Sequence, residues 1–312
     1  MNKLSTIERV LPKLRALASP CKLCARECAV DRHKGEKGAC DAARRPCVYS
    51  YSPHHGEEPP LSGVNGSGTI FFAHCNMKCL YCQNHTFSQG SGFEEIEIDG
   101  LAERMLKLQR LGCHNINLVS PTHYASEIVE ALGIALKKSL AIPIVYNTGG
   151  YDSVELIKLL DGIVDIYLPD ARYHNSGRAK KYSFAPRYAE NNRRIIREMS
   201  RQAGALKLDE KGIAQKGIIV RLLILPNNIS GTIDTLRFLK ESISDEIYIS
   251  VMSQYHPTYK AKSHPQITRR ITQKEYETVV KEVENLGFKN GWIQGLNPDH
   301  NHFLGTNIKP IC

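Results

Sequence analysis

The 312-residue sequence lacks any apolar run long enough to cross a membrane, which takes about 20 apolar residues. It also lacks a signal for export. Its start, MNKLSTIERVLPKLRAL, predicts an amphipathic helix instead, because apolar residues recur at helical spacing among charges at Leu4, Ile7, Leu11, Leu14 and Leu17. Without an export signal we expect a cytoplasmic protein, whose ten cysteines act as metal ligands or reactive thiols rather than disulfides.

No stretch has low complexity, and 42% apolar and 23% charged residues are typical of a globular chain. The net charge of +9 would suit nucleic acid, but the sequence has no recognisable nucleic-acid-binding motif. The basic segment 178–198, RAKKYSFAPRYAENNRRIIRE, alternates charged with apolar residues as a solvated helix face does. The composition therefore argues against nucleic acid as a partner. A zinc-dependent nucleic-acid-binding protein is kept as the alternative of another class.

From Thr69 onward, short apolar runs alternate with amphipathic ones, which is the pattern of a βα repeat. It predicts a parallel α/β structure, a partial barrel of six units, with a doubly wound sheet as the alternative. In both architectures the active site lies at the carboxyl ends of the strands. We expect a small Cys-rich module over 1–66 and the barrel over 67–312. The six predicted strands cover 69–74, 116–120, 142–148, 163–170, 217–226 and 246–255.

Three cysteines follow the first predicted strand with no fourth close behind: Cys75, Cys79 and Cys82, in HCNMKCLYCQNH. Thiolates are soft ligands that suit iron–sulfur clusters or zinc. Three of them can hold a [4Fe–4S] cluster with one iron open to a substrate or cofactor. The alternative is a zinc ion with His74, His85 or a distant residue as its fourth ligand. The place of this loop, at the catalytic end of a strand, favours the cluster.

This C-x3-C-x2-C motif, with Tyr81 just before its last cysteine, resembles that of the radical S-adenosylmethionine (SAM) superfamily. Within it, GSGTIFFAHCNMKCLYCQN and GCHNINLVSPTH resemble the glycyl-radical-enzyme activases, and most of all the subgroup described as pyruvate formate-lyase activating enzyme-related. The resemblance implies a partial (β/α)6 barrel and a [4Fe–4S] cluster whose open iron binds SAM. It also implies reductive cleavage of SAM to a 5′-deoxyadenosyl radical that abstracts a hydrogen atom, and it places Tyr81 among the cofactor-binding residues.

Further cofactor-binding residues follow from the same resemblance. YNTGGY is similar to the D-T-N-G of the activases, with Asn147 in place of aspartate and Thr148 beside it. Asp170 and Arg172 stand at their D-x-K, where Arg172 is expected to pair with the carboxylate of SAM. The alternative to cofactor binding is a structural role for each residue: a strand-end turn for Thr148, a helix cap for Asp170, and a histidine at the barrel rim for His256. The remaining predicted cofactor-binding residues are Ser120, Arg221 and His256.

The resemblance also implies partners: an electron donor such as flavodoxin or ferredoxin, and a glycyl radical enzyme as the substrate. Radical modification of a small molecule, a peptide or RNA is the alternative. The activases have G-G-E where this chain has the segment 120–123, SPTH, and their acidic partner for the amino group of SAM is absent from that segment.

A second group of cysteines lies near the N-terminus, in a C-x2-C-x3-C-x11-C array that supplies four thiolates. Four ligands close a site, so structural zinc is the simplest interpretation, and a second iron–sulfur cluster is its rival. Cys113 is predicted to be a core residue, and Cys312 a tail thiol or a hydrogen-atom donor. The four ligands of the predicted second metal site are Cys21, Cys24, Cys28 and Cys40.

Overall fold

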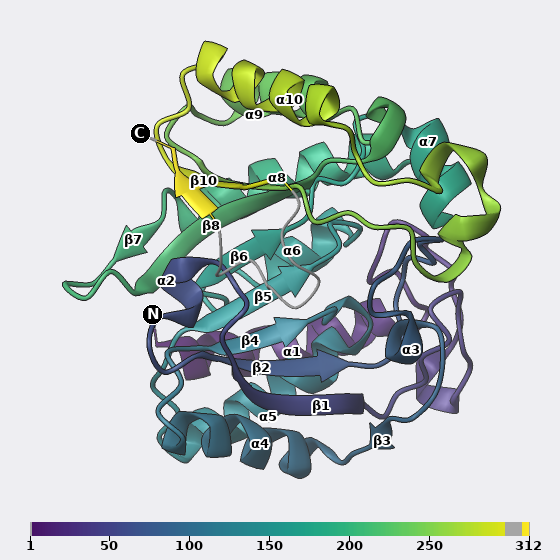
Figure 1. Ribbon diagram of the computed structural model, residues 1–312. Helices are drawn as coiled ribbons and strands as arrows, with labels where there is room; N and C mark the ends of the chain where they lie inside the picture. The colour runs from purple at the N-terminus through teal and green to yellow at the C-terminus, as the bar shows by residue number, and fades with distance from the viewer. Residues whose placement is uncertain (1, 297–307, 312) are drawn as a thin grey trace.

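The computed structural model describes residues 2–296 and 308–311 and consists of one curved sheet covered by helices on its outer face (Figure 1). The longer helices are α1 (Lys3–Ala18), α4 (Ile98–Arg110), α5 (Ala125–Lys137), α6 (Val154–Leu159), α7 (Ser176–Ser183), α8 (Tyr188–Ala203), α9 (Thr232–Ser242) and α10 (Gln273–Asn285). Two single-turn helices are α2 (Pro59–Ser62) and α3 (His85–Ser88). The strands are β1 (Cys47–His54), β2 (Ser67–Phe72), β3 (Glu94–Glu95), β4 (Ile116–Val119), β5 (Ile144–Thr148), β6 (Ile166–Pro169), β7 (Lys207–Leu208), β8 (Ala214–Leu223), β9 (Tyr248–Met252), β10 (Gly291–Gln294) and β11 (Ile308–Pro310).

The sheet confirms the predicted parallel α/β architecture. Strands β2, β4, β5, β6, β8 and β9, the six predicted ones, lie side by side in that order and are parallel. A seventh parallel strand, β10, pairs with β9 and extends the sheet beyond the six expected units. Its sequence, GWIQ, is only four residues long and half-buried at its centre, so its apolar pattern is weak. Antiparallel strands flank both edges, β1 beside β2 and β11 beside β10.

Side chains alternate between the two faces of these strands, as the pleat requires. On the outer face Ile70, Leu118 and Tyr146 belong to the main hydrophobic core, which also holds the buried faces of the covering helices. On the inner face the pairing register aligns Thr69 with Asn117, and Arg221 with Ser250. Polar residues of neighbouring strands therefore share the inside of the partial barrel.

Helix α2 closes part of that interior. Its Leu61 is fully buried and packs with inner-face residues of β5, β6 and β8, which form a small separate core. Pro59 and Pro60 occupy the first turn, where a missing backbone N–H costs nothing because that group has no partner within the helix. The buried apolar residues around Leu61 are Val145, Ile166, Leu168, Leu206, Ala214 and Ile219.

The N-terminal segment packs on the barrel through two elements. The predicted amphipathic helix is confirmed as α1, which buries Ile7, Val10 and Leu14 and packs on α5 and α6. Strand β1 pairs with β2 along six residue pairs, so residues 47–54 continue the barrel sheet. The basic segment 178–198 forms most of α7 and α8, and α8 buries Ile195, Ile196 and Met199 with charges on its other side, as the solvated-face interpretation predicts.

No helix in the described part of the chain is long and apolar enough to cross a membrane.

Candidate active site

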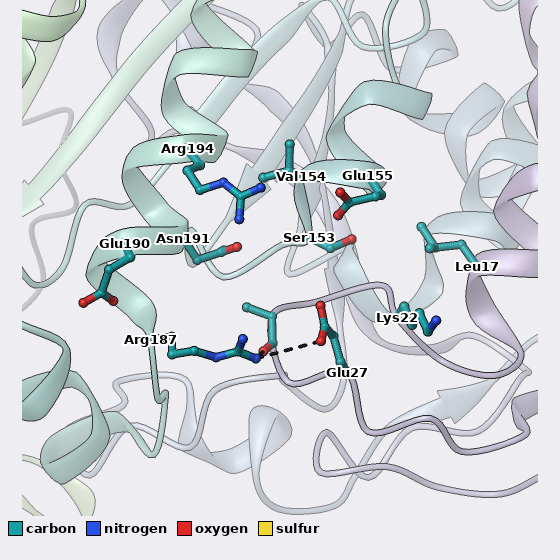
Figure 2. A pocket seen from close by; sticks show the side chains of 11 residues that line it. Leu17, Lys22, Glu27, Ser153, Val154, Glu155, Arg187, Glu190, Asn191 and Arg194 are labelled. Atoms are coloured by element: carbon teal, nitrogen blue, oxygen red, sulfur yellow. Dashed lines mark hydrogen bonds and ion pairs between the residues drawn. The ribbon is translucent and has the colours of Figure 1, made fainter.

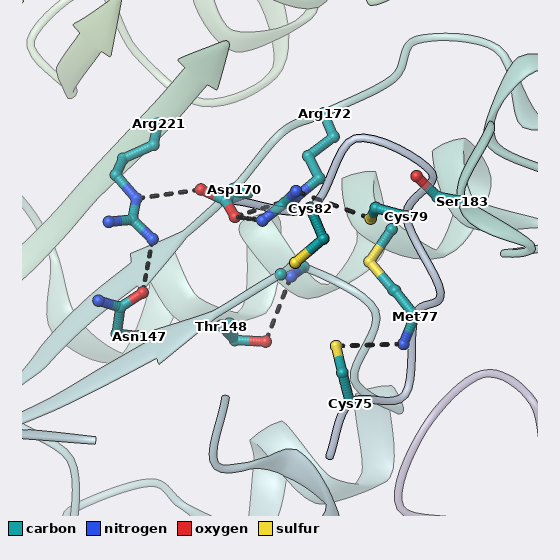
Figure 3. Close-up of polar contacts among 12 residues, drawn as sticks. Cys75, Met77, Cys79, Cys82, Asn147, Thr148, Asp170, Arg172, Ser183 and Arg221 are labelled. Carbon is teal, nitrogen blue, oxygen red and sulfur yellow. Dashed lines mark hydrogen bonds and ion pairs between the residues drawn. The ribbon is translucent and has the colours of Figure 1, made fainter. Parts of the chain in front are cut away.

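The cysteine triad lies on the loop that follows β2, where the sequence placed it. Cys75, Cys79 and Cys82 lie on this loop beside the strand ends that carry Thr148 and Asp170 (Figure 3). Backbone hydrogen bonds hold the loop against α7, from Lys78 N to the Ser183 carbonyl at 3.1 Å and from Leu80 N to the Tyr182 carbonyl at 2.9 Å. The loop is therefore fixed by long-range contacts at the carboxyl ends of the parallel strands.

The three thiols lie close enough to affect one another; Cys79 is buried, and Cys75 and Cys82 are half-buried. Burial, together with the neighbouring Cys79 and Cys82, raises the pKa of the Cys75 thiol to about 12, and Arg172 opposes this shift. Burial also raises the pKa of Cys82, with Cys79 again adding to the shift. A raised pKa keeps the thiols of Cys75 and Cys82 protonated until a metal displaces the protons, because metal binding to cysteine releases the thiol proton.

Asp170 is the centre of a buried ion-pair network beside the triad. Its Oδ2 accepts from Nε and Nη2 of Arg172 at 3.0 and 2.5 Å, and its Oδ1 accepts from Nε of Arg221 at 3.0 Å. Burial alone would raise the pKa of Asp170, but the two guanidinium groups more than offset it, and the pKa lies below its ordinary value. Arg221 also donates to Oδ1 of Asn147 at 2.5 Å. Three predicted residues from β5, β6 and β8 thus meet on the inner face.

Arg172 connects this network to the triad. Its Nη1 lies 3.8 Å from Sγ of Cys79, while the other two nitrogens face Asp170. Arg172 and Asp170 also line an open cavity of about 160 Å³, whose walls carry Tyr81 and Cys82 as well. Cationic groups, a carboxylate and a cysteine of the triad therefore face one open cavity at the catalytic edge. The other lining residues are Gln83, Asn84, Arg221, Leu223, Met252, Gln254 and Tyr255.

Thr148 and Ser120 occupy the expected strand ends but have backbone-shaping contacts. The Thr148 hydroxyl donates to Oδ2 of Asp152 at 2.6 Å and accepts from the Gly150 backbone at 3.2 Å. Gly150 has φ +77°, and a Cβ there would come within 2.2 Å of the Asp170 carbonyl oxygen, so only glycine fits this close approach. Ser120, at φ +58°, donates its backbone N–H to the Asn147 carbonyl. Both residues support the catalytic edge, and their role in binding a cofactor stays a prediction.

Tyr81 and His256 both lie near the last cysteine of the triad, Tyr81 as its chain neighbour and His256 through a contact with Gln83. Tyr81 is buried, and its hydroxyl hydrogen-bonds the Tyr173 hydroxyl at 2.7 Å. His256 is half-buried after β9, with its Nδ1 3.5 Å from the amide nitrogen of Gln83, the residue after Cys82. The structure thus brings His256 to the edge of the cysteine loop rather than to the Asp170 network, and its predicted cofactor contact remains a prediction.

Two glutamates at this site had no predicted role. Glu57 and Glu58 are buried on the loop before α2, and Oε2 of Glu57 lies 3.5 Å from Nη1 of Arg221 while its Oε1 accepts from Asn117 at 3.0 Å. Neither carboxylate oxygen of Glu58 has a hydrogen-bond partner, and the same holds for Oδ1 of Asn117 and Oγ of Ser250. In the sequence these glutamates precede two prolines within HHGEEPPLSG, which is typical of an exposed turn, so no local signal marks them as interior.

The buried carboxyl group of Glu58 should make the stability of the folded protein depend on pH. Burial raises its pKa from 4.5 to about 7, so the folded chain keeps a proton there that the unfolded chain releases. The free energy of unfolding therefore falls as pH rises from 4.5 to about 7. Above about pH 7 the folded chain bears the full cost of the buried negative charge. We expect Glu58→Gln to remove this loss and stabilise the protein above pH 7 by at most about 3 kcal/mol, with little effect near pH 4.5. Thermal unfolding midpoints of both proteins from pH 5 to 8 measure it, and parallel curves would contradict it.

Asp152 is another buried carboxylate outside the predicted site. Its Oδ1 accepts from the Thr122 hydroxyl at 2.7 Å and from the Tyr146 hydroxyl at 2.8 Å, and its Oδ2 accepts from Thr148. Three hydroxyls thus join the loops after β4 and β5 through one side chain. Asp152 also forms a backbone bridge with Cys24, which ties the N-terminal segment to the same edge.

The four N-terminal cysteines come together in space as the array predicts. Cys21, Cys24, Cys28 and Cys40 all line one cavity between the N-terminal segment and the barrel. The described part of the chain holds no three His, Cys, Asp or Glu side chains already gathered at the spacing of a single metal ion. Cys113 is buried in the main core as expected. Cys312 lies outside the described residues.

The donor set on the β2 loop fits a [4Fe–4S] cluster. Three thiols of one loop stand at the catalytic edge, next to a cavity wall that carries two guanidinium groups. An iron–sulfur cluster ligated by three thiolates carries negative charge on its sulfur atoms, and a guanidinium beside a sulfur, as Arg172 is beside Cys79, stabilises that charge. Cys75, Cys79 and Cys82 would hold the cluster, with the Asp170 network beside it.

Comparison with known proteins supports this assignment. Residues 69–171 match the family model of the Radical SAM superfamily. "Uncharacterized protein MJ0674" of Methanocaldococcus jannaschii is 31% identical over 274 residues, which cover 85% of this chain and 74% of that protein. The chain belongs to the radical SAM superfamily. Membership implies an enzyme with a [4Fe–4S] cluster and SAM, and it favours this class over a zinc-dependent nucleic-acid-binding protein.

The chain is similar to solved structures at low sequence identity. HydG, a maturase of the [FeFe]-hydrogenase, superposes with a TM-score of 0.50 at 12% identity, over 72% of this chain and 50% of that one. Methylornithine synthase (PylB) matches with a TM-score of 0.48 at 17% identity, over 69% of this chain and 61% of that one. The match spans less than two thirds of either protein's length, and the likeness to HydG concerns the fold alone.

Proposed function

We propose that this protein binds a [4Fe–4S] cluster through Cys75, Cys79 and Cys82, cleaves SAM, and abstracts a hydrogen atom from a glycine of a partner protein. The observation that carries the proposal is the meeting of this triad with the Asp170 network at one cavity on the catalytic edge. When bound there, the cluster supplies the single electron that breaks the C5′–S bond of SAM to give methionine and a 5′-deoxyadenosyl radical. A low-potential carrier such as flavodoxin or ferredoxin is the proposed source of that electron.

The residues of this chain bind and orient the cofactor. Arg172 and Arg221 offer positive charge to the carboxylate of SAM, and Asp170 holds both guanidinium groups in place. Two nitrogens of Arg172 already donate to Asp170 in the structure. Arg172 therefore has fewer N–H donors left for the carboxylate of SAM than a free arginine would have. Arg221, which contacts Asp170, Asn147 and Glu57 at once, is the better fixed of the two.

The choice of a glycine as the target rests on the resemblance to the activase motifs. GSGTIFFAHCNMKCLYCQN and GCHNINLVSPTH stand on β2, on β4 and on the loops after them, which are the elements that shape the site. The abstraction would balance as one hydrogen atom moved from the glycine Cα to the 5′ carbon, which leaves 5′-deoxyadenosine and a glycyl radical.

A small-molecule substrate is the second candidate, and the interior of the barrel favours it. Glu58, Asn117 and Ser250 present buried oxygen atoms without partners, and an unpartnered buried polar atom costs about 1–3 kcal/mol. A ligand rich in hydrogen-bond donors, such as an amine, would satisfy them. A protein loop that offers only a glycine backbone has fewer donors to give.

The two candidates differ in where the abstracted hydrogen comes from. The test incubates the anaerobic, reduced protein with SAM and either a glycine-deuterated candidate glycyl radical enzyme or deuterated small molecules. We expect deuterium in 5′-deoxyadenosine from the labelled protein, together with a stable glycyl radical in the electron paramagnetic resonance spectrum. Label from an amine-bearing small molecule without a protein radical would replace the activase assignment with the second candidate. Absence of 5′-deoxyadenosine under all conditions would contradict both.

A further inference from the structure

Three segments that meet at the cysteine triad contain no acidic residue. Although 32 of the 312 residues are aspartate or glutamate, none lies in 59–93, 171–189 or 247–274. The first of these segments holds the triad loop, and the second holds α7. The third holds the loop after β9, with its single-turn helix η4 (Tyr259–Ser263). The triad is therefore bordered by long stretches of chain without negative side chains.

Helix α7 and η4 pack on each other and on the triad loop. Tyr182 of α7 and Ala261 of η4 belong to the small core that also holds Cys79. The Tyr182 hydroxyl donates to Oε1 of Gln266, three residues after η4, at 3.1 Å. In Figure 1 the yellow-green segment that follows β9 lies beside α7. The two elements therefore lie side by side over the triad loop.

Both elements expose lysines, Lys180 and Lys181 on α7 and Lys260 and Lys262 on η4. We call these four residues the basic face. In the part of the chain that the structure describes, no carboxylate forms an ion pair with any of them. Phe184, which directly follows α7, is 51% exposed, and exposed aromatic side chains are typical of protein interfaces. The basic face therefore offers positive charge and an aromatic side chain to an acidic protein.

The charge is balanced in the pocket that lies next along the chain, where α8 begins. Three basic and three acidic side chains line that pocket (Figure 2). Arg187 pairs there with Glu27 at 3.9 Å and donates to the Ala25 carbonyl at 3.0 Å. The charge of Arg187 thus holds the N-terminal segment against α8, whereas the charges of the basic face hold no part of the described chain in this way.

Only the end of α7 separates the basic face from the triad. The backbone N–H groups of Lys78 and Leu80, on either side of Cys79, donate to the carbonyls of the last two residues of α7. These two residues directly follow Lys181. A partner on the basic face would therefore lie close to the group that the triad holds.

A partner on this face would stay outside the reaction cavity. None of the four lysines lines the cavity beside Asp170. An electron can cross the packed layer between the face and Cys79, whereas a substrate must bring its own hydrogen atom into the cavity. The position of the basic face therefore suits a donor of electrons better than a substrate.

We infer that the basic face docks an acidic one-electron carrier protein of the flavodoxin kind. The inference rests on the proposed function, in which such a carrier supplies the electron, and it adds where the carrier binds. One electron leaves the anionic flavin hydroquinone, which becomes the neutral semiquinone, and reduces the cluster from [4Fe–4S]²⁺ to [4Fe–4S]⁺. No proton moves in this step.

Reduction of the holoprotein by reduced flavodoxin, followed by stopped flow, tests the inference. The rate constant should fall steeply as salt is added, because salt screens the attraction between opposite charges. Two double variants, Lys180→Glu with Lys181→Glu and Lys260→Glu with Lys262→Glu, reverse the charge of each half of the face. In both we expect the rate constant at low salt to fall at least about tenfold. Calorimetry should show a weaker affinity for flavodoxin in both variants.

The matched control is Arg9→Glu with Lys13→Glu, which makes the same change in net charge on exposed residues of α1. Its rate constant should stay within about twofold of the wild type, because charges far from the docking site are screened. All three variants should keep the iron content of the wild type and its yield of 5′-deoxyadenosine with excess dithionite, which shows that they fold.

Wild-type rates and affinities in both basic-face variants would overturn the inference, and so would an equal loss in the control. Unchanged affinity for flavodoxin together with weaker binding of transfer RNA would also overturn it, because the face would then bind nucleic acid. These outcomes leave the proposed function intact as long as dithionite supports cleavage of SAM. A lack of cleavage with either reductant would contradict the proposed function, whereas the affinity for flavodoxin would still decide the docking.

Discussion

Replacing Cys79 by alanine is expected to abolish the cleavage of SAM. Cys79 is buried, and its sulfur lies next to Arg172 at the junction of the triad and the Asp170 network. Two thiolates cannot hold a cluster that needs three, so the iron of this site is lost with the ligand. We expect production of 5′-deoxyadenosine to fall at least about a hundredfold, with the same result for Cys75→Ala and Cys82→Ala.

The measurement is the yield of 5′-deoxyadenosine and methionine from anaerobic, reduced protein, with iron counted in the same samples. Cys113→Ala serves as the control, because it removes a buried cysteine of the main core and should keep both activity and iron. Wild-type iron and turnover in all three triad variants would refute the proposed function at its first step.

Asp170→Asn is expected to weaken SAM binding while the cluster stays in place. The substitution keeps the shape of the side chain but removes the negative charge that faces Arg172 and Arg221. Two buried guanidinium groups then lose their shared partner, and they no longer hold the geometry in which they meet the carboxylate of SAM. We expect the dissociation constant of SAM to rise roughly ten- to a hundredfold, the range seen when residues that orient binding groups are removed.

Stability and binding need separate measurement for this variant. The pKa of Asp170 is lowered in the folded chain, so its charge contributes stability above the ordinary value of 3.8, and that stability is lost as pH falls further. Asp170→Asn should therefore be less stable than the wild type at neutral pH, and the difference should narrow in acid. The matched control is Asp234→Ala, which removes a half-exposed carboxylate at the start of α9. This variant should change neither the affinity for SAM nor the unfolding midpoint. Normal SAM affinity with only a lower unfolding midpoint would make Asp170 a structural residue.

The sequence by itself determined the parallel α/β architecture and the place of the triad. Alternation of apolar runs with amphipathic ones depends on local periodicity, and β2, β4, β5, β6, β8 and β9 were predictable for this reason. The position of Cys75 directly after the first strand follows from the same pattern, since the carboxyl ends of parallel strands share one edge. Asn147, Asp170 and Arg221 were identified through motif resemblance, and the structure brings them into one hydrogen-bonded network.

Only the tertiary structure decided which groups meet inside the barrel. Glu57 and Glu58 belong to a Pro-flanked turn in the sequence, and the packing of α2 against β5, β6 and β8 carries them into the interior beside Arg221. Their burial depends on contacts with residues far away along the chain, 60 positions for Asn117 and 164 for Arg221, which no local pattern encodes. Strand β10 was missed because it is short, and pairing with β9 stabilises it. The N-terminal cysteines could be counted from the sequence, but their cavity against the loop of Cys75 depends on how that segment docks on the barrel.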